Sequence, residues 1–254
     1  MFRIGAMDGT LRQRGKVEAV EAAKRAGLDG VELNIGREPV NDRLALDDAD
    51  KQAQYLDAAK RHGVAIAGVV LDILHRNYLK NDKLAERWIA EGIPIAQKLG
   101  ATVLLLPMFG NGALNTEDEM NYVADVLKNL APAAEKARLT LGLENTISAA
   151  DNVRIMERAG SPALKVYYDV GNSTNRGFDI LREIRWLGKD RICQMHLKDN
   201  PYYLGEGRIN FPAVIRAMKE IGYDRWANLE TESPSKDAEA DAGRNARYLR
   251  SLWA

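Results

Sequence analysis

The stretch TLGLENTISAADNVRIMERAGSPALKVYYD, residues 140–169, contains a complete strand–helix–strand unit and decides the fold. Thr140–Glu144 and Lys165–Asp169 are short, mainly apolar runs of strand length, and each ends in an acid. Between them, Ala149–Ala159 has the pattern of a helix. Strands that alternate with helices in this way form parallel pairs joined by right-handed crossovers. The stretch therefore predicts one βαβ unit.

The same alternation runs along the whole chain. We predict strands at Phe2–Met7, Gly30–Ile35, Val64–Leu71, Thr102–Met108, Thr140–Glu144, Lys165–Asp169, Arg191–Lys198 and Trp226–Thr231. The predicted helices are Lys16–Ala26, Lys51–His62, Asp82–Leu99, Glu117–Arg138, Ala149–Ala159, Ile180–Leu187, Pro212–Ile221 and Asp237–Trp253. We expect Pro132 to break the fourth helix, because proline removes a helical hydrogen bond.

Several of the predicted strands are apolar on both faces, as Val103–Leu106 shows. This is typical of parallel strands covered by helices on one side and by packed side chains on the other. Eight such units in 254 residues predict an α/β protein, a single-domain (β/α)₈ TIM barrel over residues 1–254. The alternative is a doubly wound open sheet. That fold would leave two exposed edges, and the sequence has no G-x-G-x-x-G turn to support a nucleotide site.

The composition excludes some classes of protein. Lys+Arg and Asp+Glu both count 36, so there is no basic excess of the kind that nucleic-acid binders show. No apolar stretch is long enough to span a membrane, and no signal peptide is visible, so we expect a cytoplasmic protein. The lone cysteine, Cys193, cannot form an intrachain disulfide, and we predict that it is a small core residue.

Four consecutive predicted strands carry a strong metal ligand at or near their C-terminal ends. These residues are Glu144, Asp169, His196 and Glu230, separated by 25, 27 and 34 residues. Because active sites of this fold lie at the C-terminal ends of the strands, the four side chains should converge over one mouth of the barrel. Oxygen ligands with one imidazole suit Mn²⁺, Mg²⁺, Co²⁺ or Zn²⁺. Taken singly, each acid could instead cap a helix, and the histidine could be a satisfied core residue.

These segments resemble the xylose isomerase-like (β/α)₈ superfamily of sugar phosphate isomerases/epimerases and endonuclease IV-like proteins. The resemblance lies in Leu143-Glu144-Asn145, Tyr168-Asp169-Val170-Gly171-Asn172, His196-Leu197-Lys198-Asp199, Leu204-Gly205-Glu206-Gly207 and Leu229-Glu230-Thr231. It implies that the four residues above hold one divalent ion, with Mn²⁺ expected first, and that Glu144 and Glu230 also act as acid/base groups. The endonuclease branch fits poorly, because it needs several histidines and this chain has only His62, His75 and His196.

The resemblance implies an enzyme that moves a proton next to the carbonyl of a sugar or sugar phosphate. A divalent ion stabilises the enediolate that proton removal creates, and two carboxylates can take the proton and return it. Return of the proton gives an epimerase or isomerase. The alternative is a metal-dependent hydratase or lyase acting on a keto-sugar or keto-glycoside, which begins with the same step. A third alternative is a sugar-binding protein without catalysis.

Several further side chains are predicted to contact a carbohydrate substrate. They are Glu32, His75, Asn172, Lys198, Glu206 and Arg208. Ketose 3-epimerases, which this chain resembles, carry a histidine at the position of Asn172 and an arginine where this chain has Pro201 and Tyr202. This departure puts a free ketose substrate in doubt. We also expect the chain to form homo-oligomers, and we expect neither a nucleic acid nor a membrane as a partner.

Overall fold

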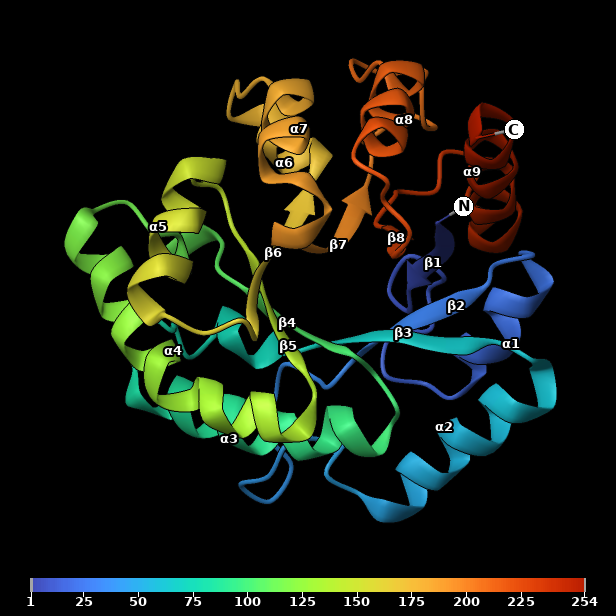
Figure 1. Cartoon of the computed structure of the whole chain (residues 1–254). Helices are drawn as coiled ribbons and strands as arrows, with labels where there is room; N and C mark the ends of the chain where they lie inside the picture. The colour runs from blue at the N-terminus through green and yellow to red at the C-terminus, as the bar shows by residue number, and fades with distance from the viewer. Residues whose placement is uncertain (1, 254) are drawn as a thin grey trace.

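A computed structural model describes residues 2–253 and shows a closed barrel of eight parallel strands in chain order (Figure 1). The strands are β1 Arg3–Met7, β2 Gly30–Asn34, β3 Ala65–Val70, β4 Val103–Pro107, β5 Thr140–Glu144, β6 Leu164–Asp169, β7 Ile192–Leu197 and β8 Trp226–Leu229. β1 pairs with β8 as well as with β2, so the sheet has no edge. The predicted TIM barrel is confirmed, and the open-sheet alternative is wrong.

Helices surround the barrel on its outside (Figure 1). The α-helices are α1 Glu18–Arg25, α2 Ala49–His62, α3 Lys83–Lys98, α4 Glu117–Ala137, α5 Ala149–Ala159, α6 Val170–Asn175, α7 Ile180–Arg191, α8 Phe211–Glu220 and α9 Ala238–Trp253. Two short 3₁₀ turns, η1 Asp72–His75 and η2 Gly110–Gly112, follow β3 and β4. In residues 2–253 we find no helix with both the length and the apolar character needed to cross a membrane.

Local sequence signals explain where the helices begin and end. The Thr116 side chain accepts the backbone N–H of Glu119, and the Glu119 side chain bonds back to the Thr116 N–H, so this capping box starts α4. Ser148 caps α5 through the N–H of Asp151. α5 ends at Gly160, whose φ of 69° lies in the left-handed region that favours glycine.

Three of the differences from the sequence prediction concern α4, α6 and β8. α4 continues through Pro132, because a proline costs a helix one hydrogen bond but the apolar face of α4 stays packed on the barrel. α6 was not predicted, since its six residues lack an apolar repeat; the Asp169 side chain starts it by accepting the N–H of Asn172. β8 ends at Leu229, so Glu230 lies one residue beyond the strand.

The core consists mainly of apolar side chains between the strands and the helices. The rings of Phe2 and Trp253 meet edge to face, 4.8 Å apart, and so tie the beginning of the chain to α9. Cys193 is buried with Tyr167 in a smaller apolar cluster, which confirms its predicted place in the core. Burial raises the pKa of the Cys193 thiol to about 12, so the group is protonated and unreactive at neutral pH.

Candidate metal centre

The structure brings the four predicted ligands together at the C-terminal ends of the strands. Glu144 ends β5, Asp169 ends β6, His196 lies near the end of β7, and Glu230 directly follows β8. One ligand atom from each residue lies within 4.8 Å of all the others. Neighbouring strands hold them in register, since Asp169 is paired with His196 across β6 and β7. The spacing along the sequence therefore predicted a real convergence in space.

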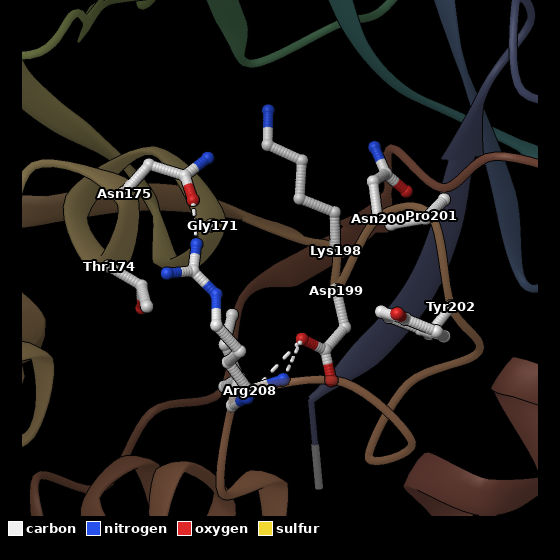
Figure 2. Close-up of a pocket in the computed structure, with 10 residues that line it drawn as sticks. Gly171, Thr174, Asn175, Lys198, Asp199, Asn200, Pro201, Tyr202 and Arg208 are labelled. Carbon is white, nitrogen blue, oxygen red and sulfur yellow. Dashed lines mark hydrogen bonds between the residues drawn. The ribbon is translucent and has the colours of Figure 1, made fainter.

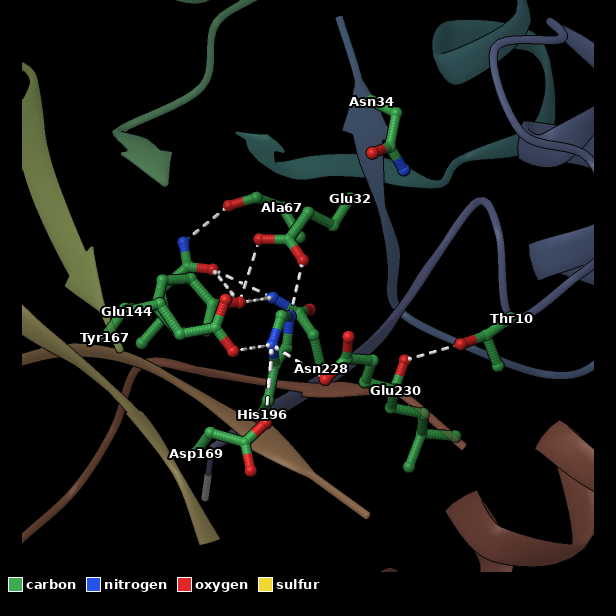
Figure 3. A network of polar contacts seen from close by, with 12 residues as sticks. Thr10, Glu32, Asn34, Ala67, Glu144, Tyr167, Asp169, His196, Asn228 and Glu230 are labelled. Atoms are coloured by element: carbon green, nitrogen blue, oxygen red, sulfur yellow. Dashed lines mark hydrogen bonds and ion pairs between the residues drawn. The ribbon is translucent and has the colours of Figure 1, made fainter. Parts of the chain in front are cut away.

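His196 lies at the centre of the cluster (Figure 3). Its Nδ1 is 2.8 Å from Glu144 Oε1, 3.5 Å from Glu230 Oε2 and 3.8 Å from Asp169 Oδ2. Burial by itself would lower the pKa of His196, but the facing carboxylates raise it well above its usual range. Burial also raises the pKa of Glu144, and the attraction of His196 offsets only part of that effect. The distances to the three carboxylates make Nδ1 the imidazole nitrogen that faces the candidate ion.

The donor set fits a divalent cation. Three carboxylates and one imidazole nitrogen are a suitable set for Mn²⁺ or a similar ion. The buried Oδ2 of Asp169 has no hydrogen-bond partner within residues 2–253, although Lys198 Nζ lies 2.8 Å away outside hydrogen-bond geometry. The ammonium group of Lys198 pairs with its charge, and the free lone pairs of this oxygen leave it able to bind a metal ion as well. Asp169 and Glu144 are buried, whereas the side chain of Glu230 is 33% exposed and faces the solvent side of the cluster.

Glu32 lies beneath the cluster, and this corrects our expectation that it contacts substrate. Its Oε2 is 2.8 Å from His196 Nε2, and its Oε1 accepts the hydroxyl of Tyr167 at 2.8 Å (Figure 3). The side chain is 0% exposed, so both oxygens are occupied inside the protein. With a cation in place of the Nδ1 proton, Nε2–H would still donate to Glu32 and the lone pair of Nδ1 would point into the cluster. Glu32 is thus a positioning residue that sets the tautomer of His196.

A buried polar layer continues this arrangement across the barrel interior. Asn228 Nδ2 donates to the Tyr167 hydroxyl and to Gln194 Oε1, each at 2.8 Å, and Gln194 Nε2 donates to the Ala67 carbonyl at 2.6 Å. Sequence analysis missed these residues, although a signal was present. Tyr167, Gln194 and Asn228 each lie two residues before a ligand and therefore point to the same side of their strand.

Lys198 connects the cluster to the solvent. Its Nζ lies 2.8 Å from Asp169 Oδ2 and donates to Glu230 Oε2. Burial opposes its charge, but the carboxylates of Asp169 and Glu230 raise its pKa. Gly171 makes room for this side chain, because a Cβ there would lie 2.5 Å from the Cγ of Lys198. Lys198 therefore holds the carboxylate of Glu230 in its orientation.

Two cavities adjoin Lys198. A cavity of about 210 Å³ is lined by Glu230, Lys198, Arg14 and Asn200, among others. A second cavity, of about 350 Å³, lies between α6 and the loop after β7 (Figure 2) and includes Lys198 and Arg208. Both cavities open at the end of the barrel that carries the ligands, so a substrate on the cluster has room on two sides of Lys198.

The other predicted substrate contacts, His75, Asn172 and Glu206, line neither of these cavities. His75 lies in η1, where its ring stacks on Phe109 at 6.1 Å, and it does not line either cavity. Burial lowers the pKa of His75, partly offset by Asp72. Glu206 is exposed and pairs with Arg244 of α9. Neither Glu206 nor Asn172 lines either cavity; the backbone N–H of Asn172 donates to Asp169 Oδ1 at 2.6 Å.

A comparison with protein-family models identifies the fold family from the sequence. Residues 20–252 match the model of the xylose isomerase-like TIM barrel. The match covers most of the chain, and the closed barrel described above has the corresponding architecture. The chain belongs to the xylose isomerase-like TIM barrel family.

Curated relatives include proteins named as sugar epimerases. The chain is 26% identical over 203 residues to 2-epi-5-epi-valiolone 7-phosphate 2-epimerase of Actinoplanes sp.. The matched region covers 78% of this chain and 73% of that protein. The chain is 28% identical over 236 residues to the putative L-ribulose-5-phosphate 3-epimerase SgbU of Escherichia coli, covering 81% and 80%.

Solved structures agree in fold. An L-ribulose 3-epimerase superposes with a TM-score of 0.82 at 19% identity and covers 100% of this chain and 95% of its own. A D-psicose 3-epimerase from Clostridium cellulolyticum, solved with D-tagatose, gives 0.83 at 14% identity, with 99% of both chains covered. Because both sequence identities are below 20%, these two structures support the fold of this chain and nothing further.

Proposed function

We propose that this protein is a divalent-metal-dependent epimerase or isomerase of sugars or sugar phosphates. The observation that carries the proposal is the four-residue cluster, with Glu144 at the end of β5, Glu230 directly after β8, and Asp169 and His196 on the two strands between them. Two carboxylates that flank one site can serve as paired acid/base groups. The epimerase relatives described above support the same class of reaction.

The roles of the residues follow from their places in the cluster. Substrate enters on the solvent side, where Glu230 and Lys198 line the smaller cavity. One glutamate removes the proton from the carbon next to the carbonyl, and the other returns a proton from the opposite side. Asp169 and His196 complete the ligand set, and Glu32 fixes the ring of His196. A divalent ion held by these four residues would supply stabilisation of the negative charge that develops on the substrate oxygens.

Backbone contacts hold Glu230 in place although it lies outside β8. Its N–H donates to the Leu197 carbonyl at 3.2 Å, and its carbonyl accepts Asn200 Nδ2 at 3.3 Å. Thr10 Oγ1 donates to the preceding carbonyl of Leu229. A base must be positioned to within fractions of an ångström to be efficient, and these bonds provide that restraint.

The test is turnover in D₂O. The protein, loaded with Mn²⁺, is incubated with L-ribulose, L-ribulose 5-phosphate, D-tagatose and D-allulose, and products are analysed by NMR and mass spectrometry. We expect a product with the same molecular formula as the substrate and solvent deuterium at one carbon. A product that has gained or lost water or an aglycone would support the hydratase or lyase alternative. Absence of exchange on every sugar would contradict the proposal.

A further inference from the structure

The larger cavity lies next to the metal centre but is lined by different side chains. Figure 2 shows Lys198, Arg208, Asn175 and Tyr202 around it, between α6 and the loop that follows β7. Lys198 belongs both to this lining and to the cluster, since its Nζ contacts Asp169 and Glu230. A substrate bound at the cluster can therefore extend a substituent into this volume of about 350 Å³.

Arg208 carries a positive charge that no carboxylate neutralises. Its Nη2 donates to the amide oxygen of Asn175, a neutral partner, and within residues 2–253 it forms no ion pair. Many other surface arginines of this chain are paired; Arg244 of α9, for example, bonds to Glu206. A guanidinium has five N–H donors in a planar fork that matches phosphate and carboxylate groups. Most of the donors of Arg208 remain free for a ligand.

One residue that lines the cavity, Asp199, has a carboxylate whose oxygens are already hydrogen-bonded within the loop after β7. Asp199 is 6% exposed, and its oxygens accept the backbone N–H groups of Gly205, Gly207, Arg208 and Ile209 at 2.9–3.2 Å. These four donors occupy lone pairs of both carboxylate oxygens. Their effect is also mechanical, because they fold the loop back and hold the backbone of Arg208 at the cavity.

We propose that this cavity binds the phosphate group of a phosphorylated sugar, with Arg208 as its principal ligand. The inference rests on the proposed function of the neighbouring cluster and narrows its substrate class to sugar phosphates. An unpaired guanidinium is suited to an anion, whereas a hydroxyl group can be bound by neutral side chains. Asn175 and Tyr202 supply neutral polar groups around the same volume.

The first experiment measures binding of inorganic phosphate and does not depend on catalysis. Chelator-treated protein is used, so that phosphate cannot bind to a metal ion, and the titration is followed by calorimetry. We expect Arg208→Ala to weaken binding by ~10–100-fold, the range for loss of a charge-assisted hydrogen bond. Arg208→Lys should retain part of the affinity. Because only the backbone N–H of Arg208 contacts Asp199, the alanine variant should keep the loop fold.

Arg244→Ala is the matched control, since it removes an exposed arginine from the same region outside the cavity. It should bind phosphate like the wild type. Wild-type protein that binds no phosphate at tens of millimolar, or an Arg208→Ala variant with wild-type affinity, would overturn the proposal.

The second experiment compares L-ribulose 5-phosphate with L-ribulose as substrates. Arg208→Ala should lower kcat/KM for the phosphorylated sugar by a larger factor than kcat/KM for the unphosphorylated sugar. Equal losses for both would show that Arg208 does not recognise phosphate. If neither sugar is converted by wild-type protein, the proposed function of the cluster is in question, while the phosphate titration still decides the cavity.

Discussion

The substitution Glu32→Gln tests the arrangement beneath the metal centre. The glutamine keeps the shape of the side chain and can still accept the Nε2–H of His196 through its amide oxygen. It removes the negative charge that orients the ring, and it presents an NH₂ group to the Tyr167 hydroxyl where a carboxylate oxygen stood. The Tyr167 hydroxyl can turn toward Gln194 Oε1, 3.4 Å away, so the fold should survive.

The expected loss is in metal affinity. Outer partners of a metal-bound histidine typically contribute ~10–100-fold. Because Glu32 is 0% exposed and both of its oxygens are bonded, we expect the upper part of that range. A loss of about 60-fold corresponds to ~2.4 kcal/mol of binding free energy.

The assay is equilibrium binding of Mn²⁺, measured by electron paramagnetic resonance of the free ion. Asp241→Asn is the matched control, because it also replaces a buried carboxylate by an amide, but Asp241 lies in α9 and contacts none of the four ligands. It should bind Mn²⁺ like the wild type. If Glu32→Gln binds Mn²⁺ with wild-type affinity while remaining folded, Glu32 does not position His196 and our reading of the buried layer is wrong.

Three further predictions concern catalysis and stability. Glu144→Gln and Glu230→Gln should each lower kcat by ~10²–10⁴-fold, and one of them should still exchange a substrate proton with D₂O, as NMR would show. Gly171→Ala should displace Lys198 and lower kcat/KM in steady-state assays without loss of bound metal, whereas retained activity would show that the contact is not needed. Burial alone would raise the pKa of Asp241, but hydrogen bonds from two serines and a tyrosine lower it. A carboxylate with a lowered pKa stabilises the fold above its unfolded pKa of about 3.9, so Asp241→Asn should be less stable than wild type at pH 7, and denaturant unfolding should show this difference shrinking as the pH falls toward 3.

The architecture and the four ligands could be predicted from sequence because both depend on local, repeating patterns. Each ligand ends an apolar run, and a parallel barrel brings such ends to the same face. Glu32 is different. Its spacing marks it as an inward-facing residue, but its neighbour His196 is 164 positions away along the chain, and only the closed barrel brings them into contact. The sequence therefore indicated that Glu32 belongs to the site but not on which side of the ligands it lies.

The loops were harder to predict, since they lack a periodic pattern. α6 depends on a single cap from Asp169, and the loop after β7 depends on four backbone bonds to Asp199. Residue type alone does not predict either hydrogen-bond pattern. Asp199 directly follows Lys198 in the sequence, for example, and such a pair suggests an ion pair. In the structure Lys198 instead contacts Asp169 and Glu230. Arg208 was predicted from the sequence to contact substrate, but its place at this cavity beside Asn175 follows from that loop and required the structure.

The central claim is that Glu144, Asp169, His196 and Glu230 together bind one divalent ion. The most direct measurement is the metal stoichiometry of purified protein after incubation with Mn²⁺ and gel filtration, by elemental analysis, beside the variant Asp169→Asn. The asparagine keeps an oxygen that can accept the N–H of Asn172 and so preserves the start of α6, but it removes the charge at Oδ2. We predict about one equivalent of Mn²⁺ in the wild type and a large loss in the variant, with circular dichroism unchanged. Wild-type protein without bound metal, or a variant that binds it equally well, would contradict the account.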